Sequence, residues 1–153
     1  MFTMGSFSSS FNTPKTTQLV TRGVCRLFRS LGFGALTEFK LSNGRRVDVI
    51  AVDRDGSFVI VEVKSSVADY RADRKWQEYL AFCERFYFAV PADFPIEIMP
   101  NECGLIVADP YVAAVRREGT AKTLNKNRKR HPLLQFALTA SDSLGKINSF
   151  ICR

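Results

Sequence analysis

The sequence predicts a mixed α/β fold, with a β-sheet flanked by helices on both faces. Helical apolar spacing comes first, followed by three strand-like runs, a second helical segment, further strands and a last helix. The third strand-like run, residues 57–64, is apolar on both alternating faces, which is typical of a central strand covered on both sides. A chain of 153 residues that is 46% apolar suits one domain with a single core.

The N-terminal part predicts a leader and then a helix. Residues 1–14 are rich in Ser, Thr, Gly and Asn, so we expect a disordered leader there, a folded domain over 15–147 and a flexible C-terminal tail over 148–153. From Thr16, apolar residues recur every three or four positions as far as Leu31, which defines one face of a helix that ends at Gly32 or Gly34. This helix contains no acidic residue.

The next elements follow from period-two patterns and turn residues. Strands are predicted over 35–41, 45–53 and 57–64, separated by Ser42-Asn43-Gly44 and Arg54-Asp55-Gly56, which predicts an antiparallel meander. After them we predict a helix over 69–84, a buried strand over 86–90, a loop over 91–100, a hairpin of 104–108 with 112–115, and a helix from about 132 to 144.

Polar residues interrupt the apolar pattern at one end of the predicted hairpin. Glu62 and Lys64 share a face of their strand, about 6.6 Å apart along it. If Gly56 takes the left-handed position of a three-residue loop, the register sets Asp48 opposite Glu62. Cross-strand partners have Cβ atoms about 4.5–5.5 Å apart, so both carboxylates could ligate one cation. A slip of one residue would move Asp48 to the other face and remove the site.

These residue types suit metal-dependent hydrolysis of a phosphodiester. Mg²⁺, with Mn²⁺ as an alternative, fits Asp48, Glu62 and the backbone carbonyl of Val63, because it prefers one or two carboxylates plus waters. Lys64 would orient the attacking water and stabilise developing negative charge. An isolated E-x-K in a strand is more often a chance pattern or an exposed ion pair. Asp48 at the matching hairpin position favours the catalytic interpretation.

On these residues the chain resembles the PD-(D/E)xK nuclease superfamily, and specifically the MmcB family of bacterial DNA-repair proteins. The resemblance extends over about residues 22–144 and rests on 44–49 (GRRVDV), 61–66 (VEVKSS), 69–79 (DYRADRKWQEY), 86–90 (FYFAV) and 104–109 (GLIVAD). It implies a restriction-endonuclease-like fold and a role in DNA repair. Val47 replaces the proline of the superfamily motif, and the first helix lacks the glutamate that many members use as a metal ligand. We expect Glu38 to replace that ligand, and the resemblance suggests Gln77 as an accessory residue.

Basic charge is concentrated in one segment. The chain carries +7, and residues 116–130 hold seven basic residues against one acidic residue, which gives +6. A solvated surface is the plain explanation, but such concentration favours phosphate contacts. The predicted nucleic-acid contacts are Lys126, Arg128, Lys129 and Arg130, with Arg71, Arg74 and Lys75 on the second helix and Ser65 as an accessory donor.

Two functions remain open at this point. The leading one is a Mg²⁺-dependent DNA nuclease in repair, and the alternative is a non-catalytic DNA-binding or scaffolding subunit that works with other repair proteins. The four cysteines are dispersed and no apolar run approaches the roughly 18 residues of a membrane span, so we expect a cytoplasmic protein with reduced thiols and no membrane contact. The sequence leaves the oligomeric state open.

Overall fold

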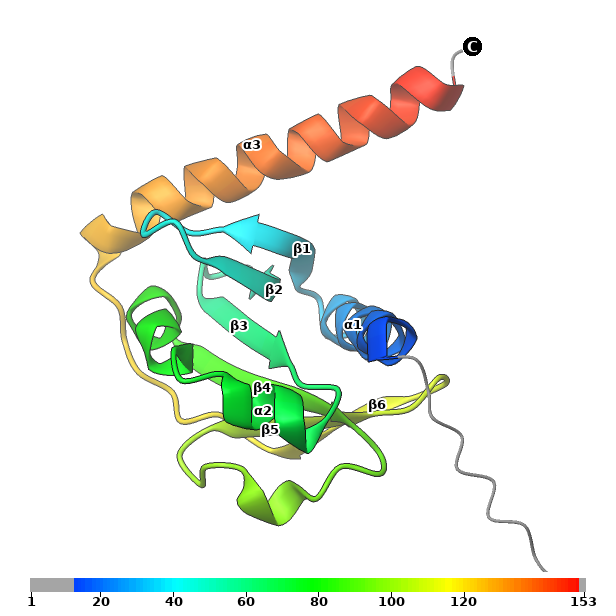
Figure 1. Cartoon of the computed structure of the whole chain (residues 1–153). Helices are drawn as coiled ribbons and strands as arrows, with labels where there is room; N and C mark the ends of the chain where they lie inside the picture. The colour runs from blue at the N-terminus through cyan, green and yellow to red at the C-terminus, as the bar shows by residue number, and fades with distance from the viewer. Residues whose placement is uncertain (1–12, 152–153) are drawn as a thin grey trace, which may run out of the picture.

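The computed structural model describes residues 13–151 and confirms a mixed α/β fold built on a six-stranded sheet (Figure 1). The strands are β1 (Gly34–Lys40), β2 (Arg46–Val52), β3 (Phe58–Val63), β4 (Arg85–Pro91), β5 (Gly104–Ala108) and β6 (Ala113–Arg117). The helices are α1 (Thr13–Ser30), α2 (Val67–Ala72) and α3 (Lys126–Ile151), with 3-10 segments η1 (Trp76–Phe82) and η2 (Ile96–Ile98).

The strands lie in the sheet in chain order. β1, β2 and β3 form the predicted antiparallel meander, β4 and β5 continue it in parallel, and β6 returns antiparallel to β5 as the predicted hairpin. The parallel connection from β3 to β4 passes through α2 and η1. Because β3, β4 and β5 run in one direction, their carboxyl ends meet at one edge of the sheet.

Helical segments cover both faces of the sheet, as predicted. α1 packs on one face through Val20, Val24 and Phe28. The other face is covered by η1, through Trp76 and Tyr79, and by partly buried side chains from the first turns of α3. All of β3 is buried, so it is the central strand that its sequence predicts.

The first helix begins earlier than predicted and ends shortly before Gly32, a glycine in the left-handed conformation. Gly32 has a φ of +88°, and the N–H of Phe33 bonds the carbonyl of Phe28 at 3.0 Å, which closes the helix end. Leu31, which the pattern assigns to the apolar face, follows the last helical residue and is 59% exposed. The prediction for Leu31 is therefore wrong.

The prediction of one helix over 69–84 is also wrong, because the chain forms α2 and η1 with a break between them. Ser66 caps α2 by accepting a hydrogen bond from the N–H of Asp69 at 3.1 Å. At the other end Asp73 leaves the helix with extended backbone angles and pairs with Lys64 at 2.7 Å. This long-range ion pair favours a break at Asp73, which helical periodicity alone does not predict.

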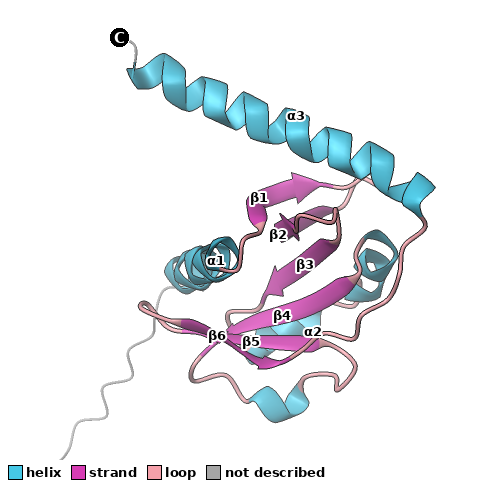
Figure 2. Ribbon diagram, turned by 180° about the vertical axis from the view of Figure 1, so that it is seen from behind, coloured by secondary structure: helices cyan, strands magenta, loops and turns pink. Residues whose placement is uncertain are grey.

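The last helix is longer at both ends than residues 132–144. Asn125 caps its start: its side-chain oxygen accepts the N–H of Asn127 at 2.9 Å. The helix continues through Ile151, so residues 148–151, predicted as part of a flexible tail, are helical. Figure 2 shows α3 running past the edge of the sheet. The leader prediction for residues 1–12 lies outside the described residues, whereas residues 13 and 14 already belong to α1.

Among the helices of the described chain, none combines the length and the apolar character that crossing a membrane requires.

Candidate active site

The predicted hairpin register is confirmed. Val49 pairs with Val61 across β2 and β3, so the next residues outward, Asp48 and Glu62, face each other. At the other end of the hairpin, Gly56 takes the left-handed conformation with a φ of +79°. Both carboxylates therefore lie on one face of the sheet, as the loop geometry predicts.

At Asp48 and Glu62, hydrogen bonds to side-chain carboxylates replace the regular backbone ladder between β2 and β3. The backbone N–H of Asp48 donates to Oε1 of Glu62 at 3.2 Å, and the N–H of Val63 donates to Oδ2 of Asp48 at 2.8 Å. Each carboxylate is thus held by the backbone of the opposite strand. Within residues 13–151, Oδ1 of Asp48 and Oε2 of Glu62 have no hydrogen-bond partner and are available to a ligand.

Burial and mutual repulsion dominate the electrostatics of the two carboxylates. Burial, reinforced by the charge of Asp48, raises the pKa of Glu62 from 4.5 to about 8. Burial also raises the pKa of Asp48, although the N–H of Val63 and the charge of Lys64 oppose that shift. Two carboxylates this close and this buried favour a proton or a cation between them.

Lys64 supplies positive charge to the same site. Its side chain is only 7% exposed, and its Nζ lies 2.7 Å from Oδ2 of Asp73. Burial lowers the pKa of Lys64, but the hydrogen bond and charge of Asp73 outweigh it, so the pKa is raised overall. The ammonium therefore stays charged, oriented by the residue at the break between α2 and η1.

An open cleft of about 550 Å³ contains these groups. Its lining residues come from β2, from the carboxyl end of β3 and from the starts of α1 and α2. These four elements can be followed in Figure 1. Its lining residues are Pro14, Thr17, Gln18, Asp48, Glu62, Val63, Lys64, Ser65 and Asp69. Thr17 and Gln18 are not predicted from the sequence, because no motif points to the first turns of α1.

The donor set fits Mg²⁺. The N–H of Val63 faces Asp48, and the N–H and carbonyl of one strand residue point to the same side, so its carbonyl faces the cleft as well. Throughout residues 13–151, no group of three or more His, Cys, Asp or Glu side chains is arranged to hold a metal ion. The cleft thus offers two carboxylates and one carbonyl, and Mg²⁺ commonly binds one or two carboxylates with waters and phosphate oxygens.

Two predicted site residues do not line the cleft. Glu38 lies opposite Asp48 in the register, but its φ is +54° and its 65%-exposed side chain pairs with Arg46 at 3.4 Å. Gln77 is exposed on η1 and is not among the lining residues. In one continuous helix over 69–84, Asp69, Asp73 and Gln77 would share a face at i, i+4 and i+8, but the break between α2 and η1 removes that shared face.

Ser65 lines the cleft but is engaged within the protein. Its backbone N–H and its hydroxyl both donate to Oδ2 of Asp69, at 3.1 and 3.4 Å. These bonds fix the turn that leads from β3 into α2. Ser65 therefore shapes the mouth of the cleft.

Comparison with known proteins identifies the family. A family model described as "DNA repair protein MmcB-like" matches residues 7–149. The chain belongs to the MmcB-like family of DNA repair proteins. The family resemblance seen in the sequence is thereby confirmed.

Two solved structures can be compared with this MmcB-like chain. A protein of unknown function from Silicibacter pomeroyi is 38% identical, with a TM-score of 0.84 over 87% of this chain and 91% of that chain. A repair endonuclease from Pyrococcus abyssi is 20% identical, with a TM-score of 0.34 over 56% of this chain and 40% of that one. No curated protein matches the chain.

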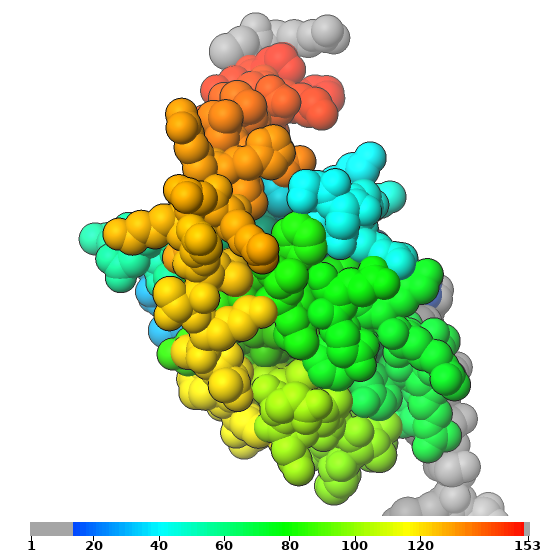
Figure 3. Space-filling view, turned by 90° about the vertical axis from the view of Figure 1, so that its left-hand side faces the viewer, coloured from blue at the N-terminus to red at the C-terminus, as the bar shows by residue number. Residues whose placement is uncertain are grey.

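The basic residues of this MmcB-like protein form two groups. Arg71, Arg74 and Lys75 are exposed at the break between α2 and η1, next to the Asp73 that holds Lys64. The second group is the basic segment, residues 116–130, which Figure 3 shows as a yellow-to-orange strip along one side of the molecule. The first group is therefore the nearer one to the carboxylates.

Two basic side chains of the basic segment are engaged within the protein. Lys129 forms a largely buried ion pair with Glu84, and Arg117 donates to the carbonyls of Cys103 and Pro100 at 2.8 and 2.7 Å. Lys126, Arg128 and Arg130 are exposed. The structure thus separates Lys129 from the other predicted phosphate contacts.

The start of α3 lies at the opposite end of β3 from the carboxylates. Glu84, the partner of Lys129, accepts the N–H of Phe58 at 2.6 Å. Phe58 is the first residue of β3 and Val63 the last, a separation of about 17 Å at the rise of an extended strand. This end of the basic segment therefore lies a strand's length away from the carboxylates.

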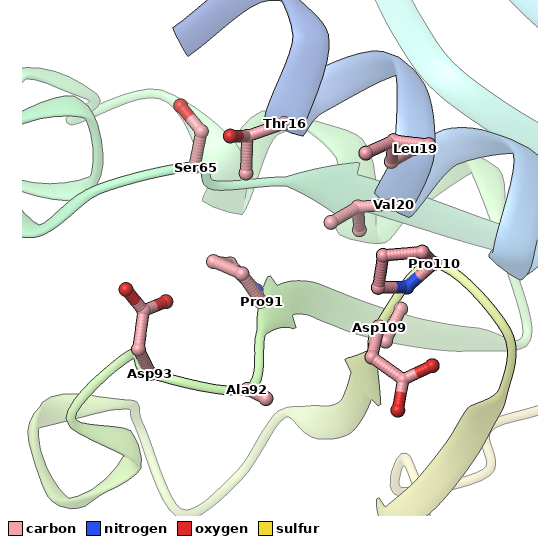
Figure 4. Close-up of a pocket in the computed structure, with 10 residues that line it drawn as sticks. Thr16, Leu19, Val20, Ser65, Pro91, Ala92, Asp93, Asp109 and Pro110 are labelled. Atoms are coloured by element: carbon pink, nitrogen blue, oxygen red, sulfur yellow. The ribbon is translucent and has the colours of Figure 1, made fainter. Parts of the chain in front are cut away.

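A second cavity of about 440 Å³ borders the cleft and shares Ser65 with it (Figure 4). It is lined by Thr16, Leu19, Val20, Ser65, Pro91, Ala92, Asp93, Ala108, Asp109 and Pro110. Asp109 uses Oδ1 to accept the N–H groups of Tyr111 and Val112. With two aspartates and no lysine or arginine, this cavity does not suit a phosphate.

Proposed function

We propose that this DNA repair protein hydrolyses DNA phosphodiester bonds in a Mg²⁺-dependent reaction. The observation that carries the proposal is the buried pair of Asp48 and Glu62, brought together by the hairpin register with Lys64 in the same cleft. Such a pair is unfavourable without a cation, and its free oxygens open into a space that a nucleic-acid strand can reach.

Each residue has a defined part in this mechanism. Asp48, Glu62 and the carbonyl of Val63 would hold the metal, which supplies Lewis-acid activation of the phosphate and of a bound water. Lys64 stabilises the negative charge that develops on the phosphate, because its ammonium is positioned before the reaction starts. Asp73 keeps that ammonium charged and oriented.

Basic side chains at the rim of the cleft would bind the DNA backbone. Arg71, Arg74 and Lys75 are exposed beside Asp73, and the exposed residues of the basic segment lie farther along the molecule. Contacts of this kind position the phosphate without reading sequence. The restriction-endonuclease-like character that the family resemblance implies agrees with this arrangement of hairpin, sheet and cleft.

The test is a nuclease assay on the full chain. Wild type and Lys64→Ala are incubated with Mg²⁺ or Mn²⁺ on single-stranded, duplex, nicked and branched DNA, with EDTA as the metal-free control. We expect products only in the presence of metal, with cleavage by the variant reduced about 100-fold or more relative to wild type. Equal cleavage by both preparations would indicate a contaminant and contradict the proposal.

A second function is favoured by a specific observation. α1 has no acidic residue to add a third carboxylate, and Lys64 is already paired with Asp73. A non-catalytic DNA-binding or scaffolding subunit of a repair assembly would keep the fold and the basic groups. Binding of DNA with no metal-dependent cleavage of any of the four substrates would favour this function.

A further inference from the structure

The outer half of α3 has no packing partner among the described residues. Residues 141–151 are exposed throughout, and the helix runs beyond the sheet (Figures 1 and 2). Six large apolar side chains of α3 are 56–81% exposed: Leu134, Leu138, Leu144, Ile147, Phe150 and Ile151. By contrast, the only charged residues between 132 and 151 are Asp142 and Lys146. A solvent-facing helix ordinarily has the reverse composition.

The apolar residues follow the spacing of a two-helix interface. One seam is formed at alternating intervals of four and three residues by Leu133, Ala137, Ala140, Leu144, Ile147 and Ile151. This period of 3.5 residues is what packing against another helix requires. Leu133 meets the sheet at one end of the seam. Ala137 and the seam residues from Leu144 outward are exposed, and Ala140 is partly exposed.

We propose that this seam binds the same seam of a second copy of the chain, with the two α3 helices antiparallel and crossing at Leu144. The order of small and large side chains along the seam favours a second copy of the chain as the partner. Small residues, Ala137 and Ala140, lie on one side of Leu144, and large ones, Ile147 and Ile151, lie on the other. An antiparallel pair centred there sets each small residue against a large one, which fills space on both sides of a two-fold axis.

Charge selects the same orientation. The first turn of α3 holds Lys126, Arg128, Lys129 and Arg130. A parallel pair would bring two such turns together, whereas the antiparallel pair keeps them roughly 50 Å apart, at 1.5 Å of rise per residue. Asp142 and Lys146 lie one helical turn apart on the face away from the seam, so no charge enters the interface.

The exposed area matches what a dimer needs. The six exposed side chains present on the order of 700 Å² of apolar surface, which exceeds the patch of a typical monomer and approaches the roughly 800 Å² per partner of a stable complex. Five of these six occupy the seam or the positions that flank it. This inference is independent of the nuclease proposal.

The experiment measures the mass of the full chain in solution by sedimentation equilibrium over a concentration series. We expect wild type to dimerise, and Leu144→Glu to raise the dissociation constant by about 100-fold, because it places two carboxylates at the two-fold axis. Ser149→Glu is the matched control: it adds the same charge on the face opposite the seam and should leave the dimer intact. Circular dichroism should show both variants folded.

Cysteine cross-linking then tests the orientation, in a background with Cys152→Ser. Leu144→Cys should form an intermolecular disulfide, whereas Ile151→Cys should not, because antiparallel helices hold those positions about 21 Å apart. The proposal is overturned if wild type remains monomeric at every concentration or if Leu144→Glu dimerises as tightly as wild type. Equal disruption by Ser149→Glu, or cross-linking at both positions, would also overturn it.

Discussion

At the scale of single residues, the main-chain N–H groups of opposite strands hold the carboxylates of Asp48 and Glu62 in place. The hydrogen bonds fix where the carboxylates lie, but they do not remove the cost of burying two negative charges side by side. A site of this kind stores an unfavourable interaction in the metal-free protein, as active sites commonly do.

This cost predicts that Glu62→Gln stabilises the metal-free protein. The pKa of Glu62 in the folded chain, about 8, lies above its ordinary value of 4.5, so the folded state binds more protons in this pH window. Stability of wild type therefore falls as the pH rises from about 5 to 8. We expect glutamine to gain on the order of 1–2 kcal/mol at pH 8 and little at pH 5. Urea unfolding with EDTA measures the gain, and an equal gain at both pH values would contradict the explanation.

The ion pair of Lys64 and Asp73 predicts strong coupling between the two residues. Both side chains are largely shielded from water, so removing one partner leaves the other without compensation. We expect Asp73→Asn and Lys64→Ala each to lower the free energy of unfolding by about 1–3 kcal/mol, and the double variant to lose less than the sum. A double-mutant cycle by urea unfolding measures this, and strict additivity would show that the pair contributes nothing.

At the scale of elements, local patterns predicted most of the sheet. Turn residues and alternating apolar positions predicted the β1–β2–β3 meander and its register, because Gly56 fixes the loop. The continuous helix over 69–84 could not be corrected from its own periodicity. It breaks where Asp73, directly after α2, meets Lys64, directly after β3, and this contact lies outside the segment whose periodicity predicts the helix.

The arrangement of side chains in the candidate site was predicted at its centre and less well at its edges. Asp48, Glu62 and Lys64 follow from one hairpin, whereas Thr17 and Gln18 reach the cleft from a helix far away in sequence. The basic segment shows the same limit, because charge counting does not reveal which side chains pair internally. Lys129 is the clearest case, with Glu84 as its partner.

That pair leads to a prediction for α3. We expect Lys129→Ala to lower the free energy of unfolding by about 1–3 kcal/mol, because it leaves the buried carboxylate of Glu84 without its cation. Arg128→Ala is the neighbouring control, since its side chain is exposed and its loss should change stability by less than about 0.5 kcal/mol. Thermal unfolding compares the two variants, and equal stabilities would show that the ion pair does not fasten α3.

At the scale of the whole molecule, the two ends of β3 carry different functions in our proposal. The carboxylates and Arg71, Arg74 and Lys75 are associated with one end, and the exposed basic residues at the start of α3 lie at the other. The separation of about 17 Å along β3 corresponds to roughly five base pairs of duplex at 3.4 Å each. DNA that reaches both groups must therefore be longer than DNA that reaches the cleft alone.

The affinity for duplex DNA should accordingly depend on its length. We expect binding, measured by fluorescence anisotropy with EDTA to prevent cleavage, to strengthen between about 6 and 12 base pairs as the second basic group is reached. The double variant Arg128→Ala with Arg130→Ala should lose that gain, and its salt slope on long duplexes should fall by about 2. Arg71→Ala with Arg74→Ala removes the same charge beside the cleft and should weaken binding at every length. An identical length dependence in the two double variants would show that the start of α3 does not contact DNA.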